Sequence, residues 1–130
     1  MKVVVEREQY RMSADLQKNR VFLEAWGDIV DPDLFKYFAD DWKKTCSEVR
    51  PGFTCLGDYT KVGVFFLKDS FAEGMKVIFE AGVHKVAVFW GKRILGRWTT
   101  EQAAEMASSE YAAKRKSFET RAEAEAWLEG

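Results

Sequence analysis

The sequence predicts an α/β fold: a single-domain sandwich in which an antiparallel hairpin opens a mostly parallel β-sheet covered by about four helices. Three observations lead to this prediction. Two strand-like segments come first, separated by a polar turn. After them, amphipathic helical segments alternate with short apolar runs, as they do when crossover helices join parallel strands. The 130 residues, 47% of them hydrophobic, are enough for one core, so residues 1–130 form one predicted domain.

The opening hairpin consists of Tyr10 to Leu16 and Arg20 to Trp26. A helix then begins at Asp31, because aspartate suits the N-cap and Pro32 suits the first helical position. This helix is predicted to continue to Pro51, where proline followed by glycine stops it. Its apolar face recurs at steps of three and four residues: Leu34, Phe35, Phe38, Trp42, Cys46 and Val49.

A strand–helix–strand unit follows. Phe53 to Leu56 and Val83 to Trp90 are apolar runs of strand length, and Gly57-Asp58 is predicted to end the first of them. The helix between them spans about Phe71 to Ala81. Gly82 ends that helix, because glycine readily adopts the left-handed conformation found after helix C-termini.

The last part of the chain predicts two more helices around a short strand. An alanine-rich helix begins at Thr99 or Thr100 and reaches about Ala113, and Arg115 to Phe118 form the strand. Thr120-x-x-Glu123 is a capping box, which predicts the start of a final helix.

Charge and composition exclude several classes of function. The 20 basic and 21 acidic residues give a formal net charge of -1, without the positive field that holds nucleic acid, so no nucleic-acid partner is predicted. The N-terminal segment lacks the apolar core of a signal peptide, and no run reaches the roughly 18 to 20 apolar residues of a membrane span. We therefore expect a cytoplasmic protein that is not an integral membrane protein.

The sequence offers no set of residues suited to catalysis, to a cofactor or to a metal. His84 is the only histidine, and it precedes a strand at the end opposite the expected ligand edge. No nucleophile has an evident base partner, and no carboxylate pair has the spacing of an acid–base site. Cys46 and Cys55 are predicted to pack as small apolar groups on a helix and on a buried strand. We expect a protein that is not an enzyme and needs no cofactor.

Several segments, taken in order, resemble the STAS-like domains of the SpoIIAA-like branch, named after the sporulation anti-sigma-factor antagonist. The resemblance covers most of the chain. It rests on Arg20 to Gly27 followed by the Asp31 helix, and on PGFTCLGD (Pro51 to Asp58), AGVHKVAVF (Ala81 to Phe89) and FETRAEAEAWL (Phe118 to Leu128). It implies the SpoIIAA-like fold and a small regulatory, non-catalytic module that binds protein partners. Some members of the family accept phosphate on a hydroxyl, and some bind nucleotides or lipids.

The family's phosphorylation turn, Asp-Ser-Ser/Thr-Gly at the head of the second helix, corresponds here to Asp69-Ser70-Phe71-Ala72. The family's acceptor position carries Phe71, so Ser70 would be the phospho-acceptor by a shift of one residue. The same residues allow a structural interpretation, because Ser70-x-x-Glu73 is typical of a capping box. Phospho-acceptor and helix cap are both open interpretations at this point.

A small-ligand site is the alternative function. WGKRILGRW (Trp90 to Trp98) follows a strand, and open α/β sheets bind ligands beyond the carboxyl ends of their strands. Its basic side chains suit a small anion, a nucleotide or a lipid headgroup, and its tryptophans suit stacking on a flat ring. A solvated basic loop is the competing interpretation. The predicted ligand edge consists of Asp58, Lys92, Arg93, Arg97 and Trp98.

The segment VGVFFL (Val62 to Leu67) is more apolar than a surface loop should be. Three explanations are open: an extra short strand, a loop folded back over the core, or an exposed patch. An exposed patch would present Val64, Phe65 and Phe66 to a protein partner, to a second copy of the chain or to a lipid. Either a protein partner or self-association is therefore expected.

Overall fold

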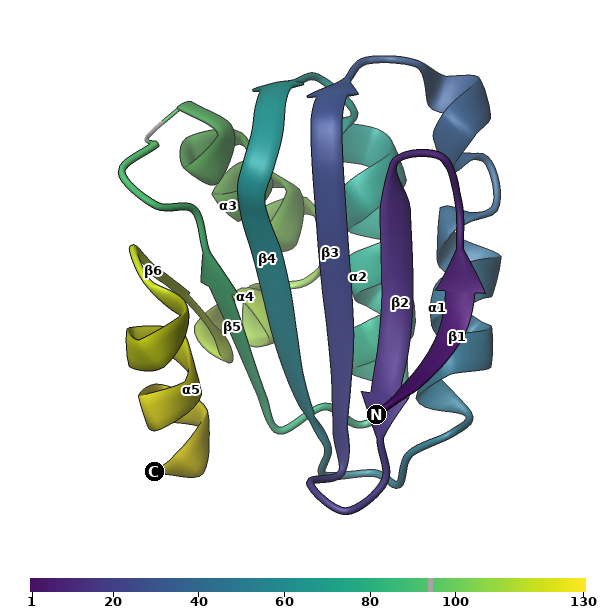
Figure 1. Cartoon of the computed structure of the whole chain (residues 1–130), viewed down its shortest axis with the longest axis vertical. Helices are drawn as coiled ribbons and strands as arrows, with labels where there is room; N and C mark the ends of the chain where they lie inside the picture. Colours follow the sequence, from purple (N-terminus) through teal and green to yellow (C-terminus); the bar gives the residue numbers. More distant parts are fainter. Residues whose placement is uncertain (94) are drawn as a thin grey trace.

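The structure is a computed structural model that describes residues 1–93 and 95–130. These residues form one six-stranded sheet, five α-helices and one 3-10 helix (Figure 1). The strands are β1 (Lys2–Glu6), β2 (Tyr10–Asp15), β3 (Arg20–Ile29), β4 (Thr54–Phe65), β5 (Lys85–Phe89) and β6 (Arg115–Phe118). The helices are the 3-10 helix η1 (Pro32–Phe35), α1 (Phe38–Cys46), α2 (Lys68–Glu80), α3 (Leu95–Ala107), α4 (Ser109–Ala113) and α5 (Arg121–Glu129).

Within the sheet, the strands lie side by side in the order in which they occur in the chain. The first two pairs, β1 with β2 and β2 with β3, are antiparallel, and all later pairs are parallel. This confirms the predicted α/β class, with an antiparallel start and a parallel continuation. β1 is an additional edge strand that the sequence pattern did not predict.

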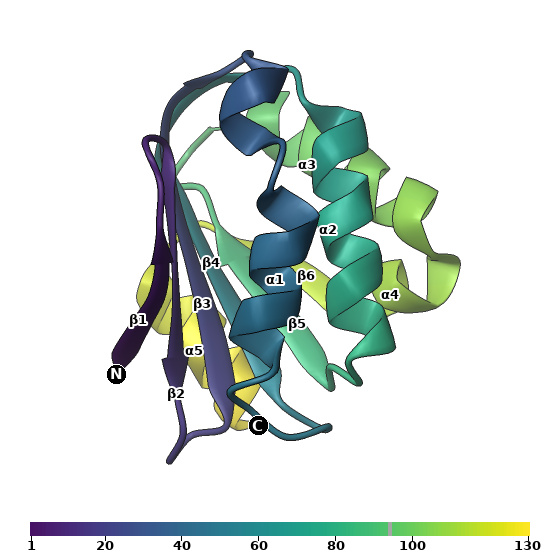
Figure 2. The same ribbon diagram turned by 90° about the vertical axis from the view of Figure 1, so that its right-hand side faces the viewer.

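Four helices cover one face of the sheet, and a single helix covers part of the other (Figure 2). Helices α1 to α4 lie together on one side, while α5 lies on the opposite side against β4, β5 and β6. Crossovers of one hand between parallel strands in chain order place their helices on the same face. Among the described residues, no helix covers the other face of β1, β2 and β3. We call this uncovered part of the sheet the open face.

Aromatic rings fill the core between the sheet and α1 to α4. Phe71 of α2 is 1% exposed, and its ring centroid lies 4.4 Å from that of Phe38 and 4.6 Å from that of Phe65. Close packing of such rings contributes more than their buried area alone. A smaller second core lies beneath α5 and consists of Leu56, Ala87, Phe89, Ala124 and Leu128.

Strand β4 is longer than predicted. It continues through Gly57 and Asp58 to Phe65, so the predicted loop VGVFFL is mostly the end of a strand. Gly57 does not mark a turn: a Cβ there would come 3.0 Å from the ring of Tyr59 and 3.1 Å from Val88. Close packing of neighbouring side chains therefore explains the glycine.

The single helix predicted from Asp31 is two helices. The Asp31 carboxylate accepts a hydrogen bond from the N–H of Asp33 at 3.0 Å, so it caps the short helix η1. Helix α1 starts only at Phe38. Phe35 and Phe38 are each 2% exposed, so the two helices deliver both rings to the core.

Other helix boundaries follow the predictions more closely. Gly82 has a φ of +93° just after α2, and the Thr120–Glu123 capping box has both of its hydrogen bonds. These observations confirm the predicted helix stop and the predicted capping box. The alanine-rich helix begins earlier than predicted, at Leu95, and is divided at Ser108, whose hydroxyl caps α4.

A buried carboxylate ties the first turn of the chain to α1. Asp41 binds Arg7 through two hydrogen bonds, from Nε at 2.9 Å and from Nη2 at 2.8 Å, and accepts a third from the hydroxyl of Tyr10 at 2.5 Å. Burial, and then the hydrogen bond to Asp41, raises the pKa of Tyr10 well above its usual value. The sheet edge and α1 are thus held together by a fully bonded polar cluster in addition to apolar packing.

We expect Asp41→Ala to lower the free energy of unfolding by about 2 to 3 kcal/mol, because it leaves Arg7 and the Tyr10 hydroxyl without their acceptor. Chemical denaturation followed by tryptophan fluorescence measures the change. Asp40→Ala is the matched control on the exposed side of α1 and should change stability by less than about 0.5 kcal/mol. Equal effects of the two substitutions would contradict this assignment.

The two cysteines give a prediction about pH. Both thiols are free and buried, and burial raises the pKa of Cys46 to about 12 and also raises that of Cys55. A thiol reacts as its thiolate, so a thiol with a raised pKa stays protonated and unreactive at any pH well below that pKa. At about pH 8 the folded protein should not react with a disulfide reagent, whereas the protein unfolded in guanidinium should release two equivalents. Rapid reaction of the folded protein would show that the thiols are accessible.

Candidate functional site

Two rows of cross-strand neighbours run across the sheet toward α5. The first row contains Glu6, Arg11, Glu24, Asp58 and Phe89. The second row contains Val3, Ser13, Phe22, Leu56 and Ala87. Alternate residues of a strand point to the same face, so both rows lie on the face that α5 only partly covers.

Opposite charges alternate along the first row. Nη2 of Arg11 lies 2.5 Å from Oε1 of Glu24, and Nη1 lies 3.4 Å from Oε1 of Glu6. Lys61 adds a second cation, with its Nζ 3.6 Å from Oε2 of Glu24. Cross-strand ion pairs of this kind are typical of a sheet surface in contact with water. The alternation of charges stops at Asp58, because Asp58 and its cross-strand neighbour Glu24 are both acidic.

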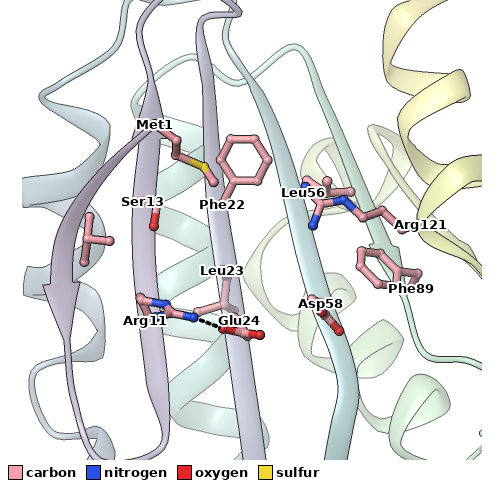
Figure 3. Close-up of a pocket in the computed structure, with 11 residues that line it drawn as sticks. Met1, Arg11, Ser13, Phe22, Leu23, Glu24, Leu56, Asp58, Phe89 and Arg121 are labelled. Carbon is pink, nitrogen blue, oxygen red and sulfur yellow. Dashed lines mark hydrogen bonds and ion pairs between the residues drawn. The ribbon is translucent and has the colours of Figure 1, made fainter.

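A pocket of about 230 Å³ lies where these charges meet α5 (Figure 3). Phe22, Leu56 and Phe89 give it an apolar floor. The other lining residues are Met1, Val3, Arg11, Ser13, Leu23, Glu24, Asp58 and Arg121. An apolar floor with a few polar groups around it is the usual composition of a small-molecule site.

Asp58 is the acidic group at one side of the pocket. Its Oδ1 accepts hydrogen bonds from the N–H and the hydroxyl of Thr60, at 2.9 and 2.7 Å. Among the described residues, neither oxygen has a cationic partner. Glu24 is the cross-strand neighbour of Asp58 and is neutralised by Arg11 and Lys61, so the uncompensated negative charge is that of Asp58.

Arg121 is the basic group at the other side. It is the first residue of α5, and the capping box of Thr120 and Glu123 fixes the backbone there. Its Nε donates to Oε1 of Glu125 at 3.0 Å, while its terminal nitrogens reach toward Leu56 (Figure 3). Within the described part of the chain, Arg121 and Asp58 do not pair with each other. Besides the Arg11–Glu24 ion pair, the pocket therefore presents one acidic group and one basic group at separate points.

The structure does not assemble the predicted ligand edge. Of its members only Asp58 lines this pocket; Lys92 and Arg93 are exposed in the turn after β5. Arg97 and Trp98 lie in α3, which packs on the other face of the sheet. Arg93 and Arg97 line two further, separate surface depressions. Helix α3 begins at Leu95, so Arg97 and Trp98 belong to a helix and not to the turn. A ligand site formed by these five residues stays a prediction.

Ser70 is not the cap of α2. The helix begins at Lys68 with Leu67 in the N-cap position, so Ser70 is its third residue. Its hydroxyl makes no hydrogen bond among the described residues, and the predicted capping box with Glu73 is therefore wrong. Asp69 is exposed and Ser70 is half-buried, both in the first turn of α2. Phosphorylation of Ser70 stays a prediction.

The alternation of side chains along β4 divides the predicted interaction loop. Phe65 is 4% exposed and packs on Phe71, whereas Val64 is 43% exposed and Phe66 is 73% exposed. The segment is thus an extra length of strand that contributes to the core and also exposes apolar side chains. We call the exposed large apolar residues at this end of the sheet and at the start of α3 the apolar rim: Val30, Val64, Phe66, Leu95 and Trp98.

Sequence reasoning missed most of the pocket. Arg121 was overlooked because it stands in a capping box, where a structural role suffices. Arg11 and Glu24 alternate with buried residues along β2 and β3, and this period of two was the available signal that they share a face. The register that places Glu24 beside Asp58 is a property of the folded sheet.

Two further features are absent from residues 1–93 and 95–130. No three side chains among His, Cys, Asp and Glu come together as a metal ion requires. No helix combines the length and the apolar character needed to span a bilayer.

Comparison with known proteins supports the fold. No protein-family model matches the sequence, and no curated protein is significantly similar to it. The structure is similar to the crystal structure of an uncharacterized DUF3478-family protein with a SpoIIAA-like fold from Shewanella loihica PV-4. The TM-score is 0.62 at 16% sequence identity, and the match covers 95% of this chain and 97% of the other. The chain has a SpoIIAA-like fold, and this confirms the fold that the resemblance in sequence implied.

Two hydroxyl substitutions test the capping assignments. We expect Thr120→Ala to lower the free energy of unfolding by about 1 kcal/mol, because it removes a complete capping box. Ser70→Ala should change it by less than about 0.5 kcal/mol, since no capping bond is lost. Denaturant titrations of both variants under the same conditions measure the difference. A larger loss for Ser70→Ala than for Thr120→Ala would show that Ser70 caps α2 after all.

Proposed function

We propose that this protein is a non-catalytic, regulatory protein-interaction module of STAS-like type, located in the cytoplasm, and that the apolar rim binds its protein partner. The SpoIIAA-like fold supports the general class. The observation that carries the proposal is the exposure of large apolar side chains in the rim: Leu95 is 82%, Phe66 is 73% and Trp98 is 60% exposed.

The members of the rim are neighbours in the fold. The N–H of Phe66 donates to the carbonyl of Ile29 at 2.9 Å, which brings Phe66 next to Val30. A surface depression of about 280 Å³ lies between Gly63 at the end of β4 and Leu95 at the start of α3. Trp98 follows one turn later in α3. The rim therefore links the ends of β3 and β4 to the first turn of α3.

Burial of such side chains is a strong driving force for association. Each large apolar side chain removed from water contributes roughly 1.5 to 3 kcal/mol before the costs of association. Aromatic side chains are enriched among the residues that dominate binding energy in interfaces, and the rim holds Phe66 and Trp98. The partner is a protein with an apolar contact surface, either a different protein or a second copy of this chain.

Photo-crosslinking in the organism that makes the protein tests this proposal. A benzophenone amino acid replaces Phe66 or Trp98, one at a time, and adducts are identified by mass spectrometry. We expect a discrete adduct from both positions, because both belong to one contact surface. Leu16 is the matched control: it is 58% exposed but lies in the β2–β3 turn, at the other end of the sheet.

The mass of the adduct distinguishes the two kinds of partner. Twice the mass of the chain identifies self-association, and any other discrete mass identifies a different protein. Phe66→Asp should abolish the adduct from Trp98 while leaving the unfolding midpoint nearly unchanged, since Phe66 is exposed. Absence of a discrete adduct at both rim positions, or the same adducts from Leu16, would contradict the proposal.

A further inference from the structure

We infer that the pocket on the open face binds a small zwitterion of the α-amino-acid class, with its ammonium at Asp58, its carboxylate at Arg121 and its apolar side chain on the floor. This site shares no residue with the apolar rim, and the inference does not depend on the proposed partner.

The size of the pocket fixes the size of the ligand. A cavity of about 150 Å³ holds benzene, so in proportion a pocket of about 230 Å³ encloses roughly nine non-hydrogen atoms, enough for the whole side chain of phenylalanine. The floor is formed by the rings of Phe22 and Phe89 with Leu56 between them. An aromatic or branched aliphatic side chain suits this floor better than a polar one.

The charges fix the headgroup. Both terminal nitrogens of Arg11 are engaged by Glu6 and Glu24, whereas Arg121 binds Glu125 through Nε and keeps its terminal nitrogens for a ligand. Asp58 is the carboxylate of the pocket that has no cationic partner among the described residues, whereas its cross-strand neighbour, Glu24, has two. An ammonium at Asp58 supplies the missing opposite charge. The terminal nitrogens of Arg121 extend toward the floor and match the two oxygens of a carboxylate.

Other classes of ligand satisfy only part of this arrangement. A simple anion pairs with Arg121 but leaves Asp58 without an opposite charge. A simple amine pairs with Asp58 but leaves the terminal nitrogens of Arg121 without an acceptor. An uncharged apolar molecule covers both groups without bonding either, which costs their solvation. The hydroxyl of Ser13, 7% exposed at the same pocket, offers one further hydrogen bond to a polar headgroup.

The test is an NMR titration of the whole chain with three probes of one shape: L-phenylalanine, 3-phenylpropionate and 2-phenylethylamine. The second probe lacks the ammonium and the third lacks the carboxylate. We expect L-phenylalanine to shift the backbone amide signals of Phe22, Leu56, Phe89 and Arg121, with each truncated probe binding at least about tenfold more weakly. No shift with L-phenylalanine and with L-leucine at about 10 mM, or equal affinity for all three probes, would overturn the inference.

Substitutions in the pocket assign each charge to its partner. Asp58→Asn should weaken L-phenylalanine about tenfold without weakening 3-phenylpropionate, and Arg121→Gln should weaken L-phenylalanine without weakening 2-phenylethylamine. Arg97→Gln is the matched control, because Arg97 pairs with Glu101 at 3.0 Å just as Arg121 pairs with Glu125, but lies outside the pocket. A similar loss in Arg97→Gln would overturn the assignment. The unsubstituted protein alone decides the probe comparison, so a variant that fails to fold does not affect the test.

The outcome is separable from that of the proposed function. Pocket variants should keep the crosslinks of Phe66 and Trp98, and rim variants should keep the affinity for L-phenylalanine. The NMR titration can therefore support or contradict ligand binding whatever the crosslinking result is.

Discussion

The crossover connections of the parallel strands place four helices on one face of the sheet, and the chemistry of both faces follows from this constraint. The covered face buries aromatic rings from strands and helices around Phe71. In the described part of the chain, the other face has only α5, which covers β4, β5 and β6. The outer side of β2 and β3 therefore carries paired charges such as Arg11 and Glu24 beside the apolar Phe22. The pocket lies at the border, where the buried floor under α5 meets the paired charges.

The apolar rim and the pocket differ in position and in chemistry, yet both are built on β3 and β4. The middle of these strands supplies Glu24 and Asp58 to the pocket, and their ends supply Val30 and Phe66 to the rim. Asp28 joins the two strands between these sites, because its Oδ1 accepts a hydrogen bond from the N–H of Val64 at 2.9 Å. The lack of a side chain at Gly63 makes room for this carboxylate: a Cβ there would lie 2.2 Å from the same oxygen. The surface proposed to bind a protein partner and the pocket proposed to bind a small molecule thus share one pair of strands.

Sequence patterns predicted structure well where a residue acts through its own neighbours in the chain. They predicted it poorly where contacts between distant segments determine the role of a residue. Thr120 with Glu123, and Gly82 after α2, do what their local patterns predict. Gly57 resembles a turn residue but lies inside β4, where a Cβ would come within 3.0 Å of the ring of Tyr59. Helix α2 starts at Lys68 without a polar cap, which is why the spacing of Ser70 and Glu73 was misleading. The pocket combines six elements through strand register, so only Asp58 among its residues was predictable as part of a ligand site.

The identity of strand order and chain order has a consequence for how the sheet forms. Each strand after the first pairs with the strand that precedes it in the chain, so no strand must be inserted between two that are already paired. Sheets whose neighbours are distant in sequence close long loops before any pairing rewards them, which slows folding. Here the sheet can grow from one edge as the chain is synthesised, and each connecting helix packs on strands that already exist. Strand β6 completes the sheet and α5 then packs against β4, β5 and β6, so the surface that surrounds the pocket is finished only after all six strands have paired.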